Sequence, residues 1–550
     1  MTAEAVRAMR WRQGLRHLLA AALRDERQGP GPAPGGLTRE ELVELLETPG
    51  SKDVGDLLSR LGEGRRLSGH NRRKLARILF DRGYIRAARA AADGRMARLL
   101  RAGTVDAIRR AHLMLTAPPA IPARRRPDPG AAPAIDVAYL AASALPDQVT
   151  GYTSRTQALV EAMIGAGLSV ECLVRTGYPT DRRRDVRVWS AANERRVGPV
   201  RYLYDSDREY SSRFAQSADA LLAPTVARIE ARLAAARPRF AHAASNHVNA
   251  LPALIAARRR GLPFVYEVRG LWEMSAATTR PGWPETERFA LEAALETLVA
   301  READLVLTLT EGLRGELVRR GVPAGSIRLL PNAVDTVRFA PGTRDPALAE
   351  RHGLAGAGLA IVYAGSLVRY EGLDDLVLGV ARARAAGVDC RLLLVGDGPM
   401  RETLQGLAAE AGIGATVRFI DPVPQGELPA LLALADVCVF PRKDLDVCRI
   451  VSPLKPFEAM AAGVPVVVSR VDALREIVGD GARGLVCAAD DPDSVAATPV
   501  RLAAEPQTRP SLAAAAPAWV RRERSWQRQA AVLLDHYAAA GLPLRPELRR

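Results

Sequence analysis

Cysteine and lysine are scarce in this sequence of 550 residues. The five cysteines stand far apart and include no Cys-x-x-Cys pair, which argues against a disulfide framework and against a zinc site of the usual spacing. Only four of the 77 basic residues are lysines. Because arginine otherwise replaces lysine throughout the chain, a lysine that remains, such as Lys455, is informative about function.

Long hydrophobic runs are also missing. No stretch of about 18 apolar residues is free of charges and turn-forming residues, so we expect no transmembrane helix. Arginines at positions 7, 10, 12 and 16 interrupt the start of the chain, where a signal peptide would need an apolar core. We therefore expect a cytoplasmic protein, and association with the inner face of the membrane as a peripheral protein is a further expectation.

The net charge of +15 is concentrated at the N-terminus. Residues 1–130 contain 26 Lys or Arg and 14 Asp or Glu, a net charge of +12, which leaves +3 for the rest of the chain. Such a field attracts nucleic acid, an anionic membrane surface or another acidic polymer. The segment has only three aromatic residues and no zinc or RNA-recognition motif, so we expect no nucleic acid partner. An anionic membrane surface and a protein partner, bound through residues 1–117, stay as alternatives.

The pattern of the chain divides it into a helical extension, a linker and two α/β domains. Residues 1–117 alternate helix-like stretches with polar breaks, and six prolines make residues 118–134 a non-helical linker. From residue 135 short apolar runs alternate with amphipathic helices, which is typical of a parallel sheet covered on both faces. The predicted strands of the first series are 135–140, 168–174, 240–244, 263–268, 305–309 and 327–330. Those of the second series are 359–363, 391–395, 417–420, 437–440, 465–468 and 484–486.

The two series predict an α/β fold with two doubly wound, Rossmann-like domains. The first domain covers residues 135–340 and the second covers residues 341–505, with the break in a Pro- and Gly-rich charged stretch. Residues 506–550 are predicted to form a C-terminal helix.

The most specific motif is the stretch from Ser452 to Ser469, SPLKPFEAMAAGVPVVVS. Prolines, a short helix and a strand follow one another here, which places Lys455 and Glu458 at the start of a helix on the carboxyl edge of the sheet. Ligands of open α/β sheets bind at that edge. Free N–H groups at a helix N-terminus suit a phosphate, and a carboxylate one turn further can accept two ribose hydroxyls. A solvated first-turn glutamate in an ordinary βαβ unit is the alternative.

Together with four other segments, this motif resembles the retaining nucleotide-sugar glycosyltransferases of family 4, which have the two-domain GT-B fold. The other segments, in chain order, are Gly151–Thr156, Leu329–Pro341, Val362–Leu373 and Leu394–Pro399. The resemblance covers about residues 135–540. It implies that the first α/β domain binds the acceptor, that the second binds the donor, and that the C-terminal helix packs back on the acceptor domain. The wording of residues 452–458 is similar to a subgroup of exopolysaccharide and surface-glycan transferases.

The resemblance also implies which residues form the site. Those expected at the nucleotide sugar are Gly365, Ser366, Arg369, Gly396, Gly398, Lys455 and Glu458. Those expected at the other substrate are Gly151, Tyr152, Arg155 and Asn332. The candidates for catalysis are Arg269, Glu267, His242 and Lys455.

The candidates in the first domain have structural alternatives. Glu267 and Arg269 end an apolar strand, where charges are costly unless they are paired or line a site. A structural ion pair is therefore the alternative to a role in the site. His242 lies on another strand, and a structural histidine is the alternative there.

Three features depart from the family pattern. Ile450 stands eight positions before Glu458, where the family often has another glutamate. Ser366 and Glu371 stand where an arginine and a lysine usually contact the diphosphate. Arg269 takes the place of a histidine that many members have at the end of the strand.

Metal-free transfer needs basic groups at the leaving diphosphate, and Arg369 and Lys455 are available for it. Asp205-Ser206-Asp207 has the spacing of a metal site, but we interpret it as a solvated loop, and we expect neither a metal nor a cofactor besides a UDP- or GDP-linked donor. The expected function is metal-independent, retaining transfer of a hexosyl unit to a glycan or lipid-linked acceptor in cell-surface polysaccharide or glycoconjugate synthesis. The alternative is a catalytically inactive protein that binds nucleotide sugars or glycans.

Overall fold

The computed structural model describes residues 76–92, 102–126, 132–179, 194–205, 215–356 and 358–548. Most of the extension predicted over residues 1–117 therefore lies outside the described residues. Two of its helices are described, α5 (Ile85–Ala92) and α6 (Ala102–Thr116). Helix α6 contacts α8 (Ala218–Ala236) and α11 (Glu287–Glu302), and Arg86 forms a 2.7 Å ion pair with Glu287. This part of the extension is thus packed on the first α/β domain.

Eight strands form the first sheet, in the order β3-β4-β2-β1-β5-β6-β7-β8. Their bounds are β1 Ile135–Ala141, β2 Val170–Val174, β3 Glu194–Val197, β4 Val200–Leu203, β5 Pro238–Ala244, β6 Phe264–Val268, β7 Leu305–Thr308 and β8 Ile327–Leu329. All neighbouring strands are parallel except β3 and β4, which form an antiparallel hairpin at the edge. The sequence analysis missed this hairpin, because its four-residue strands are rich in charge and lack the apolar run of a buried parallel strand.

The second sheet contains the six strands that the sequence predicted. They are β9 Leu359–Ala364, β10 Cys390–Val395, β11 Val417–Ile420, β12 Val437–Phe440, β13 Val466–Ser469 and β14 Leu485–Cys487. Their order is β11-β10-β9-β12-β13-β14, and every neighbouring pair is parallel. The predicted fold class, two Rossmann-like α/β domains, is confirmed.

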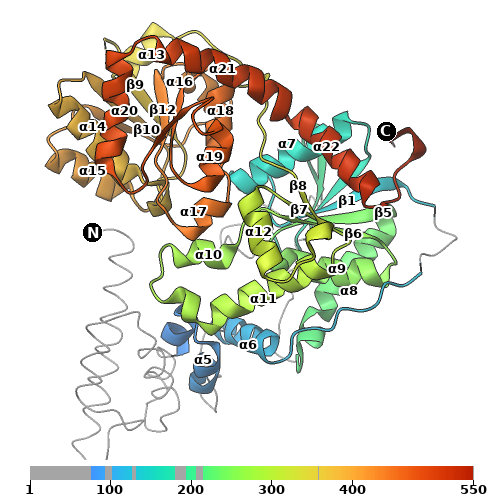
Figure 1. The fold of residues 1–550 in the computed structure, drawn as a ribbon. Helices are drawn as coiled ribbons and strands as arrows, with labels where there is room; N and C mark the ends of the chain where they lie inside the picture. The colour runs from blue at the N-terminus through green and yellow to red at the C-terminus, as the bar shows by residue number, and fades with distance from the viewer. Residues whose placement is uncertain are drawn as a thin grey trace, which may run out of the picture.

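Helices cover the sheets of both domains (Figure 1). The other helices of the first domain are α7 Gly151–Gly165, α9 His247–Arg259, α10 Trp272–Ala277 and α12 Glu311–Arg319. Those of the second domain are α13 Pro346–Arg351, α14 Leu373–Ala385, α15 Arg401–Glu410, α16 Leu428–Leu432, α17 Asp446–Ile450, α18 Lys455–Ala461, α19 Asp472–Val478 and α20 Pro492–Ala504. Among the described residues, no helix is both long and apolar enough to cross a membrane.

The central strand β1 shows how the first domain is packed. Successive side chains of a strand point to opposite faces of the sheet. Val137 and Tyr139 accordingly enter the core under α7, whereas Ala138 and Leu140 enter a separate core under α8, α9 and α11. A near-continuous apolar strand is the consequence of two buried faces.

The C-terminal segment crosses from the second domain back to the first (Figure 1). It forms two helices, α21 (Thr508–Glu523) and α22 (Trp526–Ala539), where the sequence analysis expected one. Helix α21 packs on α18 and helix α22 packs on α7. The break lies at Ser525, which caps α22, and the backbone N–H of Val334 donates to the carbonyl of Arg524 at 2.8 Å. The interdomain linker and the break between the helices are thus joined.

Candidate functional site

The carboxyl ends of β9 and β10 meet the start of α18 at one edge of the second sheet. Gly365 follows β9 with a positive φ of 152°, and a Cβ at this position would overlap with Cε of Lys455. Gly396 follows β10, and a Cβ there would overlap with the carbonyl oxygen of Gly365. A Cβ at Gly398 would in turn meet the carbonyl oxygen of Leu367. Only glycine permits these close approaches, so the three predicted glycines and Lys455 lie together.

Glu371 is the buried counter-ion of this edge. Its Oε1 accepts from Nζ of Lys455 and from Nη2 of Arg442, each at 2.8 Å, and only 3% of its side chain is exposed. Burial by itself would raise the pKa of Glu371, but the charges of Arg442 and Lys455 lower this pKa to about 2. Burial lowers the pKa of Lys455, and Glu371 opposes that shift. Two cations therefore share one carboxylate, which leaves a net positive charge beside Gly365.

Arg442 is a site residue that the sequence analysis missed. It follows β12 at the same carboxyl edge, its Nη1 donates to the carbonyl of Val451 at 3.0 Å, and its buried Nε has no partner among the described residues. Its position directly after a predicted strand was a usable signal. Two other predicted donor residues, Ser366 and Arg369, are exposed on the loop after β9.

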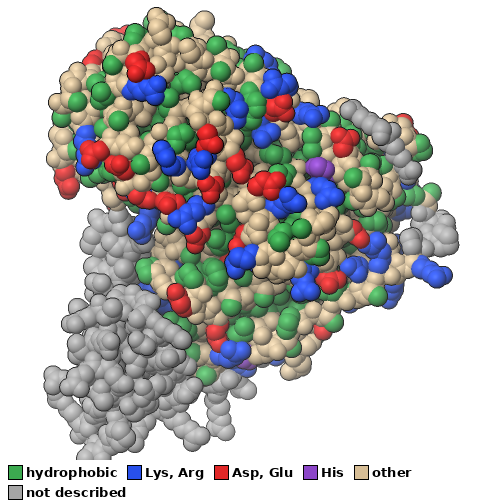
Figure 2. Space-filling model, in the orientation of Figure 1, with side chains coloured by type: hydrophobic (Ala, Val, Ile, Leu, Met, Phe, Trp, Pro, Cys, Tyr) green, Lys and Arg blue, Asp and Glu red, His purple; other side chains and the backbone are tan. Residues whose placement is uncertain are grey.

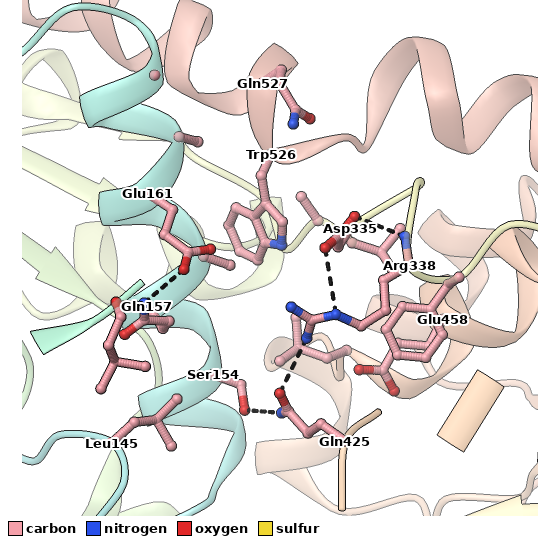
Figure 3. Close-up of a pocket in the computed structure, with 18 of the residues that line it drawn as sticks. Leu145, Ser154, Gln157, Glu161, Asp335, Arg338, Gln425, Glu458, Trp526 and Gln527 are labelled. Atoms are coloured by element: carbon pink, nitrogen blue, oxygen red, sulfur yellow. Dashed lines mark hydrogen bonds and ion pairs between the residues drawn. The ribbon is translucent and has the colours of Figure 1, made fainter. Parts of the chain in front are cut away.

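Glu458 faces a cavity of about 530 Å³ between the two domains. Figure 3 shows Glu458 and Arg338 on one side of it and α7 on the other. Burial raises the pKa of Glu458 to about 7, while Lys455 and Arg338 act in the opposite direction. Nε2 of Gln425 donates to Oγ of Ser154 at 2.7 Å across the cavity. The cavity is thus built from both domains, with a titratable carboxylate in its wall.

The loop at the start of α7 faces the segment that leads into α18. Gly151 is exposed, and a Cβ there would lie 3.8 Å from Cδ1 of Leu454 in the second domain. The hydroxyl of Tyr152 would lie 2.9 Å from a Cβ at Gly270, a position that is also close to Val451. Burial raises the pKa of Tyr152 to about 12. Both predicted residues therefore lie where the two domains face each other.

Glu267 and Arg269 form a buried ion pair in the first domain. Oε2 of Glu267 accepts from Nη2 of Arg269 and from the hydroxyl of Tyr139, both at 2.7 Å, and Oε1 accepts from Nε of Arg155 at 2.8 Å. The charges of Arg269 and Arg155 hold the pKa of Glu267 well below its usual range, despite burial. Arg269 also donates to Oγ1 of Thr156 at 2.7 Å. The pair thus fixes α7 against β6, and none of its members lines the interdomain cavity.

His242 and Asn332 are likewise buried. Nδ1 of His242 lies 2.6 Å from the hydroxyl of Tyr537 on α22, and burial lowers the pKa of His242. Oδ1 of Asn332 accepts from Nη1 of Arg155 at 2.9 Å, and its Nδ2 donates to the carbonyl of Ser452 at 2.7 Å. Asn332 and Arg155, both predicted at a substrate, here connect the buried ion pair to the second domain.

No cluster of three or more metal-binding side chains occurs in the part of the chain that the structure describes. Within the Asp205-Ser206-Asp207 segment, Asp205 pairs with Arg228 at 2.8 Å. Asp207 lies outside the described residues.

Two Rossmann-like domains with a ligand-sized cavity between them define the GT-B class of structure. Two family models match the chain: the "Glycosyl transferase 4-like domain" over residues 150–333 and the "Glycosyl transferases group 1" model over residues 346–519. The D-inositol 3-phosphate glycosyltransferase of Nocardiopsis dassonvillei is 31% identical over 300 residues, which are 53% of this chain and 68% of that protein. The chain therefore belongs to the GT4-type glycosyltransferases with the GT-B fold.

Another relative is the GDP-mannose-dependent alpha-(1-6)-phosphatidylinositol monomannoside mannosyltransferase of Mycolicibacterium smegmatis. It is 32% identical over 244 residues, which are 43% of this chain and 63% of that protein. The match to this mannosyltransferase thus spans less than two thirds of its length.

Solved structures agree with the fold. Sucrose-phosphate synthase from Thermosynechococcus elongatus superposes with a TM-score of 0.59 and 20% identity, covering 76% of this chain and 99% of the other. HepE from Anabaena, in complex with UDP and glucose, gives a TM-score of 0.55 at 16% identity and covers 74% of this chain and 100% of the other. At this identity the likeness concerns the fold.

The shared carboxylate gives a first prediction. Glu371→Gln leaves Arg442 and Lys455 buried without a counter-ion, and we expect it to lower the free energy of unfolding at pH 7 by about 3–5 kcal/mol. Because burial lowers the pKa of Lys455, this lysine can lose its proton as the pH rises, so the loss should shrink toward pH 10. Urea unfolding at both pH values measures it.

The control for that experiment is Glu402→Gln, which removes an exposed carboxylate from the same domain and should change stability by less than about 0.5 kcal/mol. Equal stability of Glu371→Gln and Glu402→Gln would contradict the assigned role of Glu371.

Proposed function

We propose that this chain is a metal-independent, retaining hexosyltransferase that moves a sugar from a nucleoside-diphosphate sugar to a glycan or lipid-linked acceptor. The observation that carries the proposal is the convergence of Gly365, Gly396, Lys455 and Glu458 beside the interdomain cleft. A compact positive charge next to bare backbone suits a diphosphate, and a nearby carboxylate suits a ribose.

The proposed roles in the second domain follow from its charges. Lys455 and Arg442 neutralise the diphosphate as it leaves, since preorganised cations stabilise charge that develops in the transition state. The carboxylate of Glu458 accepts the ribose hydroxyls. Residues 341–505 would thus be the donor domain, and residues 135–340 the acceptor domain.

In the first domain we propose positioning roles for the buried candidates. Glu267, Arg269 and Arg155 hold the start of α7, and with it Gly151 and Tyr152, at the acceptor side of the cleft. His242 lies behind them and contacts α22 through Tyr537.

The acceptor class is proposed from the relatives and the subgroup resemblance. One relative is named for a phosphatidylinositol mannoside acceptor and another for inositol 3-phosphate. Both acceptors carry a phosphate. We propose an acceptor of the same chemistry, used in cell-surface glycan synthesis.

Turnover of the purified chain with UDP- and GDP-sugars tests the proposal. Release of free nucleoside diphosphate that depends on an added acceptor supports transfer. Binding of a nucleotide sugar without any turnover would instead favour the inactive alternative, to which Ile450, Ser366 and Glu371 point.

The pKa of Glu458 gives a second prediction. The ionised form accepts hydroxyl hydrogen bonds, so the affinity for a nucleotide sugar should rise as the pH increases through about 7, by up to about tenfold per pH unit below that value. A nucleotide sugar is the right probe because its diphosphate diester does not titrate there. Glu458→Gln should weaken binding by about 1.5–3 kcal/mol and flatten the profile.

Isothermal titration calorimetry between pH 6 and 8 measures both effects. Glu161→Gln, which changes a carboxylate on the α7 side of the same cavity, is the matched control and should keep the wild-type profile. An unchanged profile in Glu458→Gln would rule out this carboxylate as the ribose acceptor.

Lys455 gives a third prediction. Lys455→Ala leaves Glu371 paired with Arg442, so the fold should persist while turnover falls about 100- to 1000-fold. Lys443→Ala is the control, because Lys443 pairs with Asp374 and Asp375 and stands outside the motif. Equal losses in both variants, or full dependence of the wild type on Mn²⁺, would contradict the proposed charge neutralisation.

The basic extension gives a fourth prediction. We propose that its net charge of +12 over residues 1–130 holds the enzyme on an anionic membrane surface, at about 1 kcal/mol per basic residue close to the lipid. The full chain should sediment with anionic vesicles at low salt and be released as salt screens the field. Sedimentation with neutral vesicles is the control, and failure to bind anionic vesicles would leave a protein partner as the alternative.

A further inference from the structure

A second cavity, of about 1030 Å³, opens between α6, α10, α11, α12 and α17. Its wall is largely apolar: Met114, Leu115, Met274, Leu298 and Ile450 line it and pack with their other sides against the core of the first domain. Figure 2 shows apolar side chains gathered over the region of α11, below the second domain. The volume is at the upper end of the range for small-molecule sites, and nothing in the proposed transfer chemistry uses it.

The charged residues of this cavity are mostly arginines. Its lining contains four arginines and two carboxylates. Arg319 and Arg320 share Glu316, and Arg449 pairs with Asp446. Arg301 is exposed at the last turn of α11, and the structure records no ion pair for it within the described ranges. An apolar wall with an unpaired arginine at its edge is complementary to an amphiphile with an anionic head group.

The cavity is also close to the proposed donor site. Ile450 ends α17, and only four residues separate it from Lys455. At 3.8 Å per residue the two Cα atoms are at most about 19 Å apart. Ile450 is held in place because its carbonyl accepts from Oγ1 of Thr310 and because Gly312 leaves it room. A ligand whose chain lies in the cavity can therefore present its head group to the cleft.

We propose that this cavity binds the hydrocarbon chain of the acceptor, a single-chain amphiphile whose phosphate is held by Arg301. The proposal rests on the proposed function and deepens it, because it specifies a lipid phosphate as the acceptor and gives the chain a binding site. Burial of each methylene contributes about 0.8 kcal/mol, so the chain supplies affinity and the arginine supplies selectivity for the anion.

The experiment measures binding of decyl phosphate, below its micellar concentration, to the full chain by isothermal titration calorimetry. Inorganic phosphate and decyl maltoside are the comparison ligands. We expect decyl phosphate to bind at least tenfold more tightly than either. Equal binding of decyl phosphate and inorganic phosphate would show an anion site without a chain site, and no binding of decyl phosphate would overturn the proposal outright.

Two variants test the two parts of the site. Ala294 is exposed and lines the cavity, so Ala294→Trp should fill the space and lower the affinity for decyl phosphate at least tenfold. Ala227→Trp, at an exposed alanine of α8, is the matched control and should bind as the wild type does. Unchanged binding in Ala294→Trp would contradict the chain site.

Arg301→Ala should lower the affinity for decyl phosphate about tenfold and leave that for decyl maltoside unchanged. Arg521→Ala, at an exposed arginine of α21, is the control. An equal effect on both amphiphiles would contradict the role of Arg301.

Nucleotide-sugar binding, measured in the same variants, should equal that of the wild type, since neither substitution touches the edge with Gly365 and Lys455. This separates the two claims: a wild type that binds no nucleotide sugar defeats the proposed function and leaves the binding of decyl phosphate to be judged by itself.

Discussion

The donor edge of the second domain depends on one buried carboxylate. Glu371 holds Arg442 and Lys455 at 2.8 Å each and brings residues that are distant in sequence against the glycine at the end of β9. A buried ion pair contributes little net stability by itself, but removing one partner is costly. We infer that Glu371 is kept because it fixes the position of two cations. This explains how a carboxylate can stand in a loop where related chains have a basic residue.

The same edge is tied to the first domain through the segment before α18. The carbonyls of Ile450, Val451 and Ser452 accept, in turn, from Thr310, Arg442 and Asn332. Two of these three donors belong to the first domain and its linker. The segment is thus bonded from both sides, and its distance to the acceptor loop is fixed by side chains that are themselves buried. An isoleucine at position 450 fits this arrangement because it packs against the first domain's core.

The sequence predicted the sheets well because apolar strands between amphipathic helices are a local pattern, and all twelve predicted strands occur. The edge hairpin from Glu194 to Leu203 was missed because its short strands are charged. The glycines and Lys455 were found since they stand in contiguous motifs. Arg442 and its bond to Glu371 were missed because the pairing spans 71 residues, and such contacts are set by the packing of the sheet rather than by neighbouring residues.

Hydrogen–deuterium exchange of the full chain with and without UDP and GDP tests the central claim most directly. A ligand at 100 times its dissociation constant stabilises the bound state by about 2.7 kcal/mol, which slows exchange where it binds. The account predicts that one of the two nucleotides protects residues 365–372 and 452–458 together. Protection confined to other segments, or none with either nucleotide at saturating concentration, would contradict the assignment of the nucleotide-sugar site.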